Sequence, residues 1–181
     1  MIQLGSDPNC IIFAYNSMKK VLICLCLLIA CSFSKCAQPD DVQKRVEEIY
    51  SNVRDVYLKH YEDGKSLWKV NLDSLYYSEE LYRLDSQIGD LENELHEPLI
   101  HDCDFWIHAQ DFPSDLAFRV LRVKMDGNKK AYVTINIHCF RDDEEEVLTM
   151  VYERDNWFID DKFDGTLKKQ IRQELKEYGK K

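Results

Sequence analysis

Strict alternation of side-chain polarity between Ala131 and Phe140 constrains the fold more than any other feature of this chain. The positions of one parity are Ala131, Val133, Ile135, Ile137 and Cys139, and those of the other are Tyr132, Thr134, Asn136, His138 and Phe140. A period of two over ten residues predicts a strand with one face in the core. Asp126-Gly127-Asn128, just before it, is typical of a hairpin turn, because Gly and Asn tolerate positive φ. Ala117–Met125 is the expected partner strand.

Two more strands follow in the sequence. Val147–Glu153 and Trp157–Lys162 are rich in apolar and β-branched residues, and Arg154-Asp155-Asn156 between them predicts a tight turn. The acidic run Asp142–Glu146 is expected to be a loop. Consecutive strands joined by short turns pair antiparallel, so the pattern predicts a four-stranded meander.

Helical periodicity precedes the strands. Pro39-Asp40-Asp41 predicts a helix start with an Asp as N-cap, and Glu62-Asp63-Gly64 predicts its end. Apolar residues recur between them at spacings of three and four, at Val42, Val46, Ile49, Val53 and Tyr57. Leu67–Tyr77 suits either an extended segment or a helical turn.

A second helix is predicted from Ser78-Glu79-Glu80, and a final one is expected after Asp164-Gly165-Thr166. The second has an inward stripe at Leu81, Leu84, Ile88, Leu91 and Leu95, and the last has one at Leu167, Ile171 and Leu175. Helices outside an antiparallel sheet make an α+β fold. We therefore expect a single α+β domain over residues 40–181.

The N-terminal region has the pattern of an export signal. Met18 is followed by Lys19-Lys20 and then by an apolar run from Val21 to Cys31. At 1.5 Å per residue that run covers only about half of a roughly 30 Å hydrocarbon core. We interpret residues 18–30 as a signal peptide and residues 1–17 as an upstream extension, with a long n-region as the alternative.

The segment Leu28-Ile29-Ala30-Cys31 resembles a bacterial lipobox. The resemblance implies cleavage before Cys31, a lipid on that cysteine, and residues 31–39 as a tether to the membrane of the cell envelope, on its periplasmic or surface-facing side. Cleavage after Ser34, which would release a soluble periplasmic protein, is the alternative.

Charge and cysteine content limit the function. The chain has 24 Lys+Arg against 33 Asp+Glu, a formal net charge of −9, and so lacks the basic surface that binding to nucleic-acid phosphates needs. Cys103 and Cys139 suit either one disulfide or two small buried residues.

Two segments are rich in acidic and aromatic residues that suit a functional role. The first contains Asp102, Asp104, Phe105, Trp106, Gln110 and Asp111, and the second contains Trp157, Ile159, Asp160 and Asp161. Together with the lipobox and the order of elements, they resemble a family of bacterial exported lipoproteins with a domain of unknown function. In that family an Asp-x-Asp-aromatic segment leads to a Gln-Asp pair, and a Trp-x-Ile-Asp-Asp strand precedes the last helix. Trp106 departs from the Pro expected at its position.

The resemblance implies a cystatin-like fold related to nuclear transport factor two. In such folds a curved sheet wraps a helix and can form a cone-shaped pocket. Fold alone does not assign a function, since such folds serve enzymes, binders and scaffolds.

The same residues include potential metal ligands and acid–base groups. Asp102, Asp104 and Asp111 with His96, His101 and His108 offer ligands for zinc or manganese, but Pro98 breaks the helix that would align the histidines, so we expect no metal and no cofactor. The short Asp side chains are expected to cap backbone amides, with Phe105 and Trp106 plugging the end of the sheet. Of Asp160 and Asp161, one is expected to face solvent and the other to cap the final helix or to bind the first segment.

We therefore expect a non-catalytic module that binds a small ligand or an envelope protein. Tyr76, Tyr77, Tyr82 and Trp106 suit a contact surface, although core packing explains them equally well. The alternative is a small cone-pocket hydrolase or isomerase, with Asp104, Asp111 or Asp161 paired to His108 or His138 as acid and base.

Overall fold

The computed structural model describes residues 38–179, so the extension, the signal peptide, Cys31 and most of the tether lie outside the described residues. Helices α2 (Pro39–Asp63), α3 (Leu72–Tyr76) and α4 (Glu79–Leu95) precede strands β1 (Ala117–Asp126), β2 (Lys130–Cys139), β3 (Asp142–Glu153) and β4 (Asn156–Asp161), and α5 (Leu167–Tyr178) follows them. This order confirms the α+β class.

The four strands form one antiparallel sheet in the order β1-β2-β3-β4, as expected for a meander. The prediction of a loop over Asp142–Glu146 is wrong, because these residues begin β3 and pair with β2, with Ile135 opposite Glu146. The turn is instead Phe140-Arg141, whose φ angles are 54° and 71°. A long partner strand offers the acidic residues a ladder of backbone hydrogen bonds, and their charged side chains remain exposed except that of Glu146.

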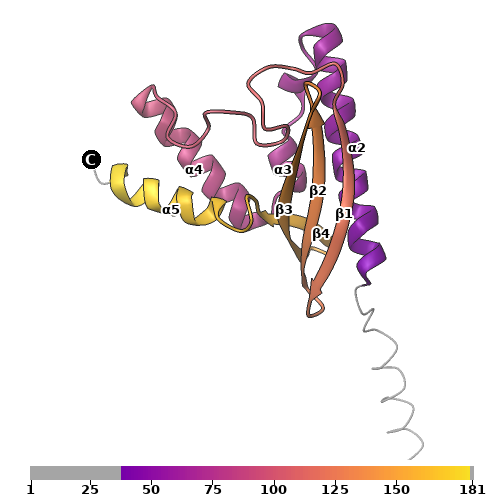
Figure 1. The fold of residues 1–181 in the computed structure, drawn as a ribbon. Coiled ribbons are helices and arrows are strands. Elements are labelled where there is room, and N and C mark those ends of the chain that lie inside the picture. The colour runs from indigo at the N-terminus through magenta and orange to yellow at the C-terminus, as the bar shows by residue number, and fades with distance from the viewer. Residues whose placement is uncertain (1–37, 180–181) are drawn as a thin grey trace, which may run out of the picture. The chain divides into compact units, whose positions relative to one another are not determined.

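Helix α2 packs against the sheet beside β1 (Figure 1). Its predicted stripe is buried throughout, with no member more than 1% exposed. The N-cap is Gln38 rather than an Asp, because Pro39 takes the first helical position, where its missing N–H costs nothing. Asp41 instead accepts a hydrogen bond from the backbone N–H of Gln38. Gly64 ends the helix at φ 63°.

The segment between the first two long helices is helical rather than extended. Leu67–Lys69 forms a 3₁₀ turn, and α3 follows with the Asn71 side chain accepting from the backbone N–H of Ser74. Ser78 caps α4, and its own backbone N–H donates to the carbonyl of Ile159 on β4 at 2.7 Å. The helix thus starts at the edge of the sheet, which fixes its first turn against β4.

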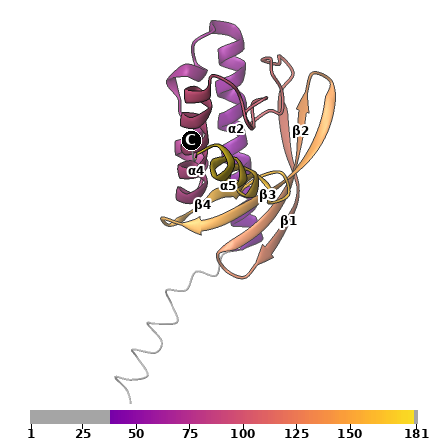
Figure 2. The same ribbon diagram turned by 90° about the vertical axis from the view of Figure 1, so that its left-hand side faces the viewer.

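Helices α2 and α4 lie on the same side of the curved sheet (Figure 2), and α5 packs on α4. The apolar faces of the helices and the sheet meet in one core. Over residues 38–179, no helix is long and apolar enough to cross a membrane.

Candidate functional site

The loop that carries the first motif folds back on itself at Asp104. The backbone N–H of Asp104 donates to the carbonyl of Ala109 at 3.0 Å, and that of His108 donates to the carbonyl of Asp104 at 2.8 Å. This closure turns Phe105, Trp106 and Ile107 into the core, where each is at most 8% exposed. Phe105 and Trp106 therefore anchor the loop in the core.

Trp106 is the centre of a buried aromatic cluster. Its ring stacks on Tyr77 at 5.2 Å between centroids and meets Tyr50 and Tyr76 edge-on at 5.9 and 6.1 Å. Of the two interpretations of Tyr76, Tyr77 and Trp106, core packing is confirmed and a contact surface is not, because the same packing buries all three. Only Tyr82 of that set is exposed, at 37%.

Asp104 uses both carboxylate oxygens inside the protein. Oδ1 accepts from the backbone N–H of Trp106 at 2.8 Å, and Oδ2 accepts from the hydroxyl of Tyr57. Burial and the neighbouring charge of Asp104 raise the pKa of Tyr57, which keeps its hydroxyl a donor. Asp104 thus joins the loop to the C-terminal half of α2.

Asp73 on α3 faces the same loop. Its Oδ1 accepts from the indole N–H of Trp106 at 2.8 Å, whereas its Oδ2 has no hydrogen bond with any residue that the structure describes. Burial and the negative charge of Asp85 raise the pKa of Asp73 to about 6, although the bond from Trp106 acts in the opposite direction. At neutral pH the site therefore holds a carboxylate that forms no ion pair with the described residues, although the charge of Lys162 acts to lower its pKa.

These side chains border a pocket of about 450 Å³. One part of its wall is polar, with the two carboxylates, Tyr57 and Trp106, and the other is apolar. The apolar part comes from Leu67, Val70 and Leu72, and Lys69 and Asn71 complete the lining. A negative, partly dry wall beside an apolar wall suits an organic cation with a short hydrocarbon part.

A buried ion pair contacts the backbone of the loop. Lys162, fully buried, donates from Nζ to the carbonyl of Phe105 and lies 3.5 Å from Glu146 Oε2. Its Nζ also lies 5.1 Å from the centroid of Trp106. Burial acts to raise the pKa of Glu146, but the charges of Lys162 and His108 outweigh it and lower that pKa. Lys162 directly follows the second motif, so it links the two motif segments.

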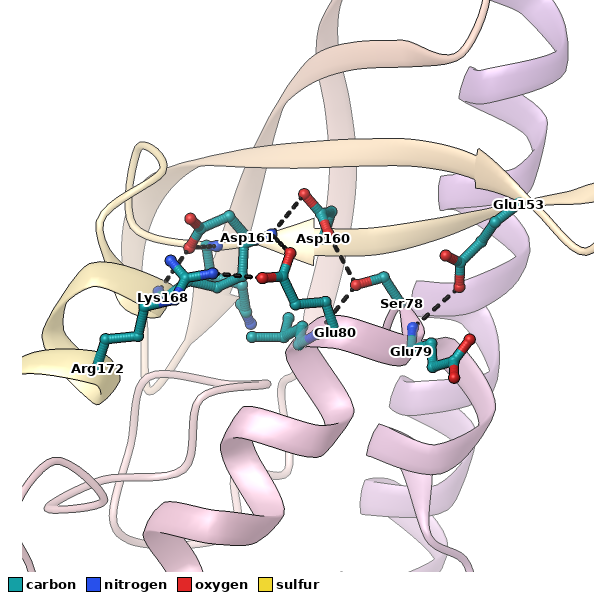
Figure 3. Close-up of polar contacts among 10 residues, drawn as sticks. Ser78, Glu79, Glu80, Glu153, Asp160, Asp161, Lys168 and Arg172 are labelled. Atoms are coloured by element: carbon teal, nitrogen blue, oxygen red, sulfur yellow. Dashed lines mark hydrogen bonds and ion pairs between the residues drawn. The ribbon is translucent and has the colours of Figure 1, made fainter. Parts of the chain in front are cut away.

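The aspartates of the second motif lie at the junction of β4, α4 and α5 rather than in the pocket (Figure 3). Asp160 accepts from Ser78 Oγ and from Lys168 Nζ, both at 2.8 Å. Asp161 Oδ1 accepts from the backbone N–H of Lys168 at 3.1 Å and so caps α5. The expectation that one of the pair faces solvent is wrong, because Asp160 is half-buried in the ion pair with Lys168.

The remaining motif residues are structural or exposed. Trp157 is buried against Tyr152, and its carbonyl accepts from Arg45 Nε at 3.2 Å. Gln110 Nε2 donates to the carbonyl of Asp102 at 3.0 Å on the outside of the loop. Asp111 is exposed beside them. These residues do not line the pocket that Asp73 and Asp104 border.

The histidines and cysteines are dispersed. His101 lies between Asp85 and Glu92, His108 lies between Glu144 and Glu146, and His96 ends α4 in the left-handed region. Within residues 38–179, no three His, Cys, Asp or Glu residues are placed to hold a metal ion. Cys103 and Cys139 are free thiols in the structure.

Sequence reasoning found one side of this site and missed the other. Asp104 and Trp106 were predicted, but Tyr57, Asp73 and Lys162 were not. The one available signal was a hydroxyl-bearing residue, Tyr57, on an otherwise aliphatic helix stripe. Asp73 had no such signal, because it lies in the segment whose conformation the sequence left open.

Comparison with known proteins adds no identity. No protein-family model, curated protein or solved structure matches this chain. The family resemblance and its fold name therefore stay predictions, and the function of the site is inferred from its geometry alone.

Proposed function

We propose that this protein is a lipid-anchored bacterial envelope protein whose α+β domain binds a small ligand without transforming it. The basic start, short apolar run and lipobox-like Leu28–Cys31 support export and anchoring. Two lipid chains or more on Cys31 would hold the domain firmly at a membrane, whereas one would bind it marginally.

The observation that carries the binding proposal is the free oxygen of Asp73 at a pocket of about 450 Å³. A half-buried carboxylate that has no ion pair with the described residues is costly, and a ligand that brings an ammonium group would offset that cost. Leu67, Val70 and Leu72 would cover a short hydrocarbon part of the same ligand. The ligand class that fits best is therefore a small amine with an apolar tail.

The alternative is acid–base catalysis by a small hydrolase or isomerase. The raised pKa of Asp73 favours it, since a carboxyl group that titrates near neutrality can exchange a proton with a substrate. Asp104 is a poor second group, because both of its oxygens accept bonds from the protein. His101 and His108 pair with other carboxylates outside the pocket lining, so no imidazole complements Asp73 there. Binding without catalysis is the better supported function.

Mass spectrometry of the mature protein tests the anchor. We expect a diacyl or triacyl mass on Cys31. An unmodified N-terminus at Lys35 would refute anchoring and favour the soluble periplasmic alternative.

Thermal unfolding with matched probes tests the pocket. We expect n-butylammonium at pH 7.5 to raise the Tm of the wild-type protein. n-Butanol and butyrate should change the Tm by less than about 0.5 °C. Asp73→Asn should abolish the rise, whereas Asp111→Asn, which removes an exposed carboxylate outside the pocket, should preserve it. Equal responses to the amine and to butyrate would count against the proposal.

A further inference from the structure

β1 is the edge strand of the sheet, and its apolar side is incompletely covered. Within the described residues it pairs with β2 alone, through nine of its ten residues. No residue of β1 is buried, although its half-buried apolar residues pair with β2 residues that are at most 1% exposed. The half-buried residues Phe118, Val120, Val123 and Met125 lie directly opposite buried Ile137, Ile135, Val133 and Ala131. The apolar layer of the sheet thus continues into β1, and no strand of the described residues 38–179 pairs with its outer edge.

A cavity of about 120 Å³ lies where this edge meets α2. Val46 and Tyr50 of α2 and Phe118 and Val120 of β1 form its apolar lining. Glu47, Arg54 and Arg119 are the charged residues that line the same cavity. An extended chain beside β1 would place alternate side chains towards this cavity, because side chains on a strand alternate between its faces.

β1 carries exposed basic side chains in an otherwise acidic protein. Arg119, Arg122 and Lys124 are exposed, and none forms an ion pair with any residue in the described part of the chain. Their cross-strand neighbours on β2 are Asn136, Thr134 and Tyr132, which carry no charge. With a net charge of −9 for the whole chain, three adjacent unpaired cations are a local exception.

We propose that the outer edge of β1 receives an extended acidic segment of another protein as a fifth strand. Backbone hydrogen bonds to the strand edge would supply affinity, as in other cases of strand addition. Acidic side chains of the segment would lie beside Arg119, Arg122 and Lys124, and alternate apolar side chains would extend the layer of Phe118 and Val120. This surface is separate from the pocket at Asp73 and goes beyond the proposed function.

The positive charge of β1 favours an acidic segment over a second copy of the chain as the added strand. Pairing of two β1 edges would set cations of one copy beside cations of the other, and like charges in neighbouring strands destabilise a sheet. The register shift between Val120 and Arg122 also interrupts the ladder. A bulge and exposed cations both discourage indiscriminate edge pairing, whereas an acidic segment turns the cations into attractive contacts.

Fluorescence anisotropy with synthetic peptides tests the proposal on the folded protein. The probe is a labelled, end-capped peptide of four Glu-Val repeats, and its charge control has four Lys-Val repeats. We expect saturable binding of the Glu-Val peptide that weakens as salt rises, and at least about tenfold weaker binding of the Lys-Val peptide. Equal binding of the two peptides would overturn the proposal.

Protein variants locate the binding surface. Combined R119E, R122E and K124E substitutions should weaken binding at least about tenfold, whereas K65E, K169E and K176E, an equal charge change on other exposed lysines, should weaken it less than about threefold. Circular dichroism checks that both triple variants are folded. Equal losses in the two variants would show general electrostatic attraction and would overturn the assignment to β1.

N-methylated peptides separate strand addition from other acidic contacts. Methyl groups on one alternate set of backbone nitrogens should abolish binding, while methyl groups on the other set should preserve it, because only one set faces the protein edge. Equal tolerance of both sets would overturn strand pairing. Vesicles with phosphatidylglycerol provide the last arm, and binding to them through the same three cations without peptide binding would assign the surface to lipid instead.

Discussion

The indole N–H of Trp106 donates a 2.8 Å hydrogen bond to Asp73, and this contact joins the motif loop to the short helix α3. Trp106 is 5% exposed, and Asp73 lines the pocket. The loop is thereby held by a side chain whose charge depends on pH. The properties of the pocket should follow the protonation of Asp73.

The first prediction concerns the effect of Asp73 on stability. Its folded-state pKa, about 6, lies above the ordinary aspartate value of 3.8, so the native state binds more protons between these values and stability falls as pH rises through that window. Asp73→Asn should therefore raise the free energy of unfolding at pH 8 by up to about 3 kcal/mol and have little effect near pH 3.5. Urea unfolding at both pH values measures this. A destabilised variant at pH 8 would contradict the account.

The second prediction concerns His101. Burial acts to lower its pKa, but hydrogen bonds with Asp85 and Glu92 outweigh burial and raise the pKa to about 9. A raised folded-state pKa gives stability that is present in full below pH 6.5 and is lost as pH rises through about 9. We expect His101→Asn to cost about 1–2 kcal/mol at pH 6 and clearly less at pH 10, after allowance for partial exposure.

His96→Asn is the matched control for His101. His96 ends α4, the helix that carries Asp85 and Glu92, in the left-handed region that Asn tolerates. It should change stability little at either pH. A cost of His101→Asn that does not vary with pH would mean that packing, not charge, holds His101.

The third prediction concerns the buried pair Lys162 and Glu146. Lys162→Met should lower the free energy of unfolding by about 3–5 kcal/mol, because it leaves a buried carboxylate without its ammonium. The double variant with Glu146→Gln should cost less than the sum of the two single variants. Urea unfolding of all four proteins measures the coupling. Strict additivity would show that the two charges do not stabilise each other.

The fourth prediction concerns the turn between β2 and β3. The carboxylate of Asp115 accepts from the backbone N–H groups of Phe140 and Arg141, both at 3.0 Å, and both residues have positive φ. Asp115→Ala should cost about 1–2 kcal/mol, whereas Asp142→Ala, at an exposed strand position, should cost little. Arg141→Gly should reduce the cost of Asp115→Ala, because Gly takes positive φ without strain. Equilibrium unfolding checks each variant.

The sheet and long helices could be predicted because each has a local signature. The alternation over Ala131–Phe140 and the stripe from Val42 to Tyr57 report burial directly, since burial follows the period of the element. The acidic start of β3 could not be predicted in this way. The buried carboxylate of Glu146 pairs with Lys162 and His108. These partners are distant in the sequence, so they leave no local pattern.

The candidate site follows the same division. Asp104 and Trp106 stand out in a motif, but Tyr57 and Asp73 reach them only through the tertiary packing of α2 and α3. The motif pair Asp160-Asp161 was equally conspicuous, yet it serves the junction of β4 and α5. A conspicuous carboxylate therefore indicates a constrained position, and only its neighbours show whether it lines a pocket.

Chemical-shift mapping with n-butylammonium is the sharpest test of a cation site at Asp73. In ¹⁵N-labelled wild-type protein at pH 7.5, the account predicts saturable shifts of the Trp106 indole N–H and of the backbone amides of Asp73 and Asp104. It predicts no such shifts with butyrate or in Asp73→Asn. Shifts confined to other parts of the protein, or the same shifts with butyrate, would contradict a cation-binding pocket beneath the motif loop.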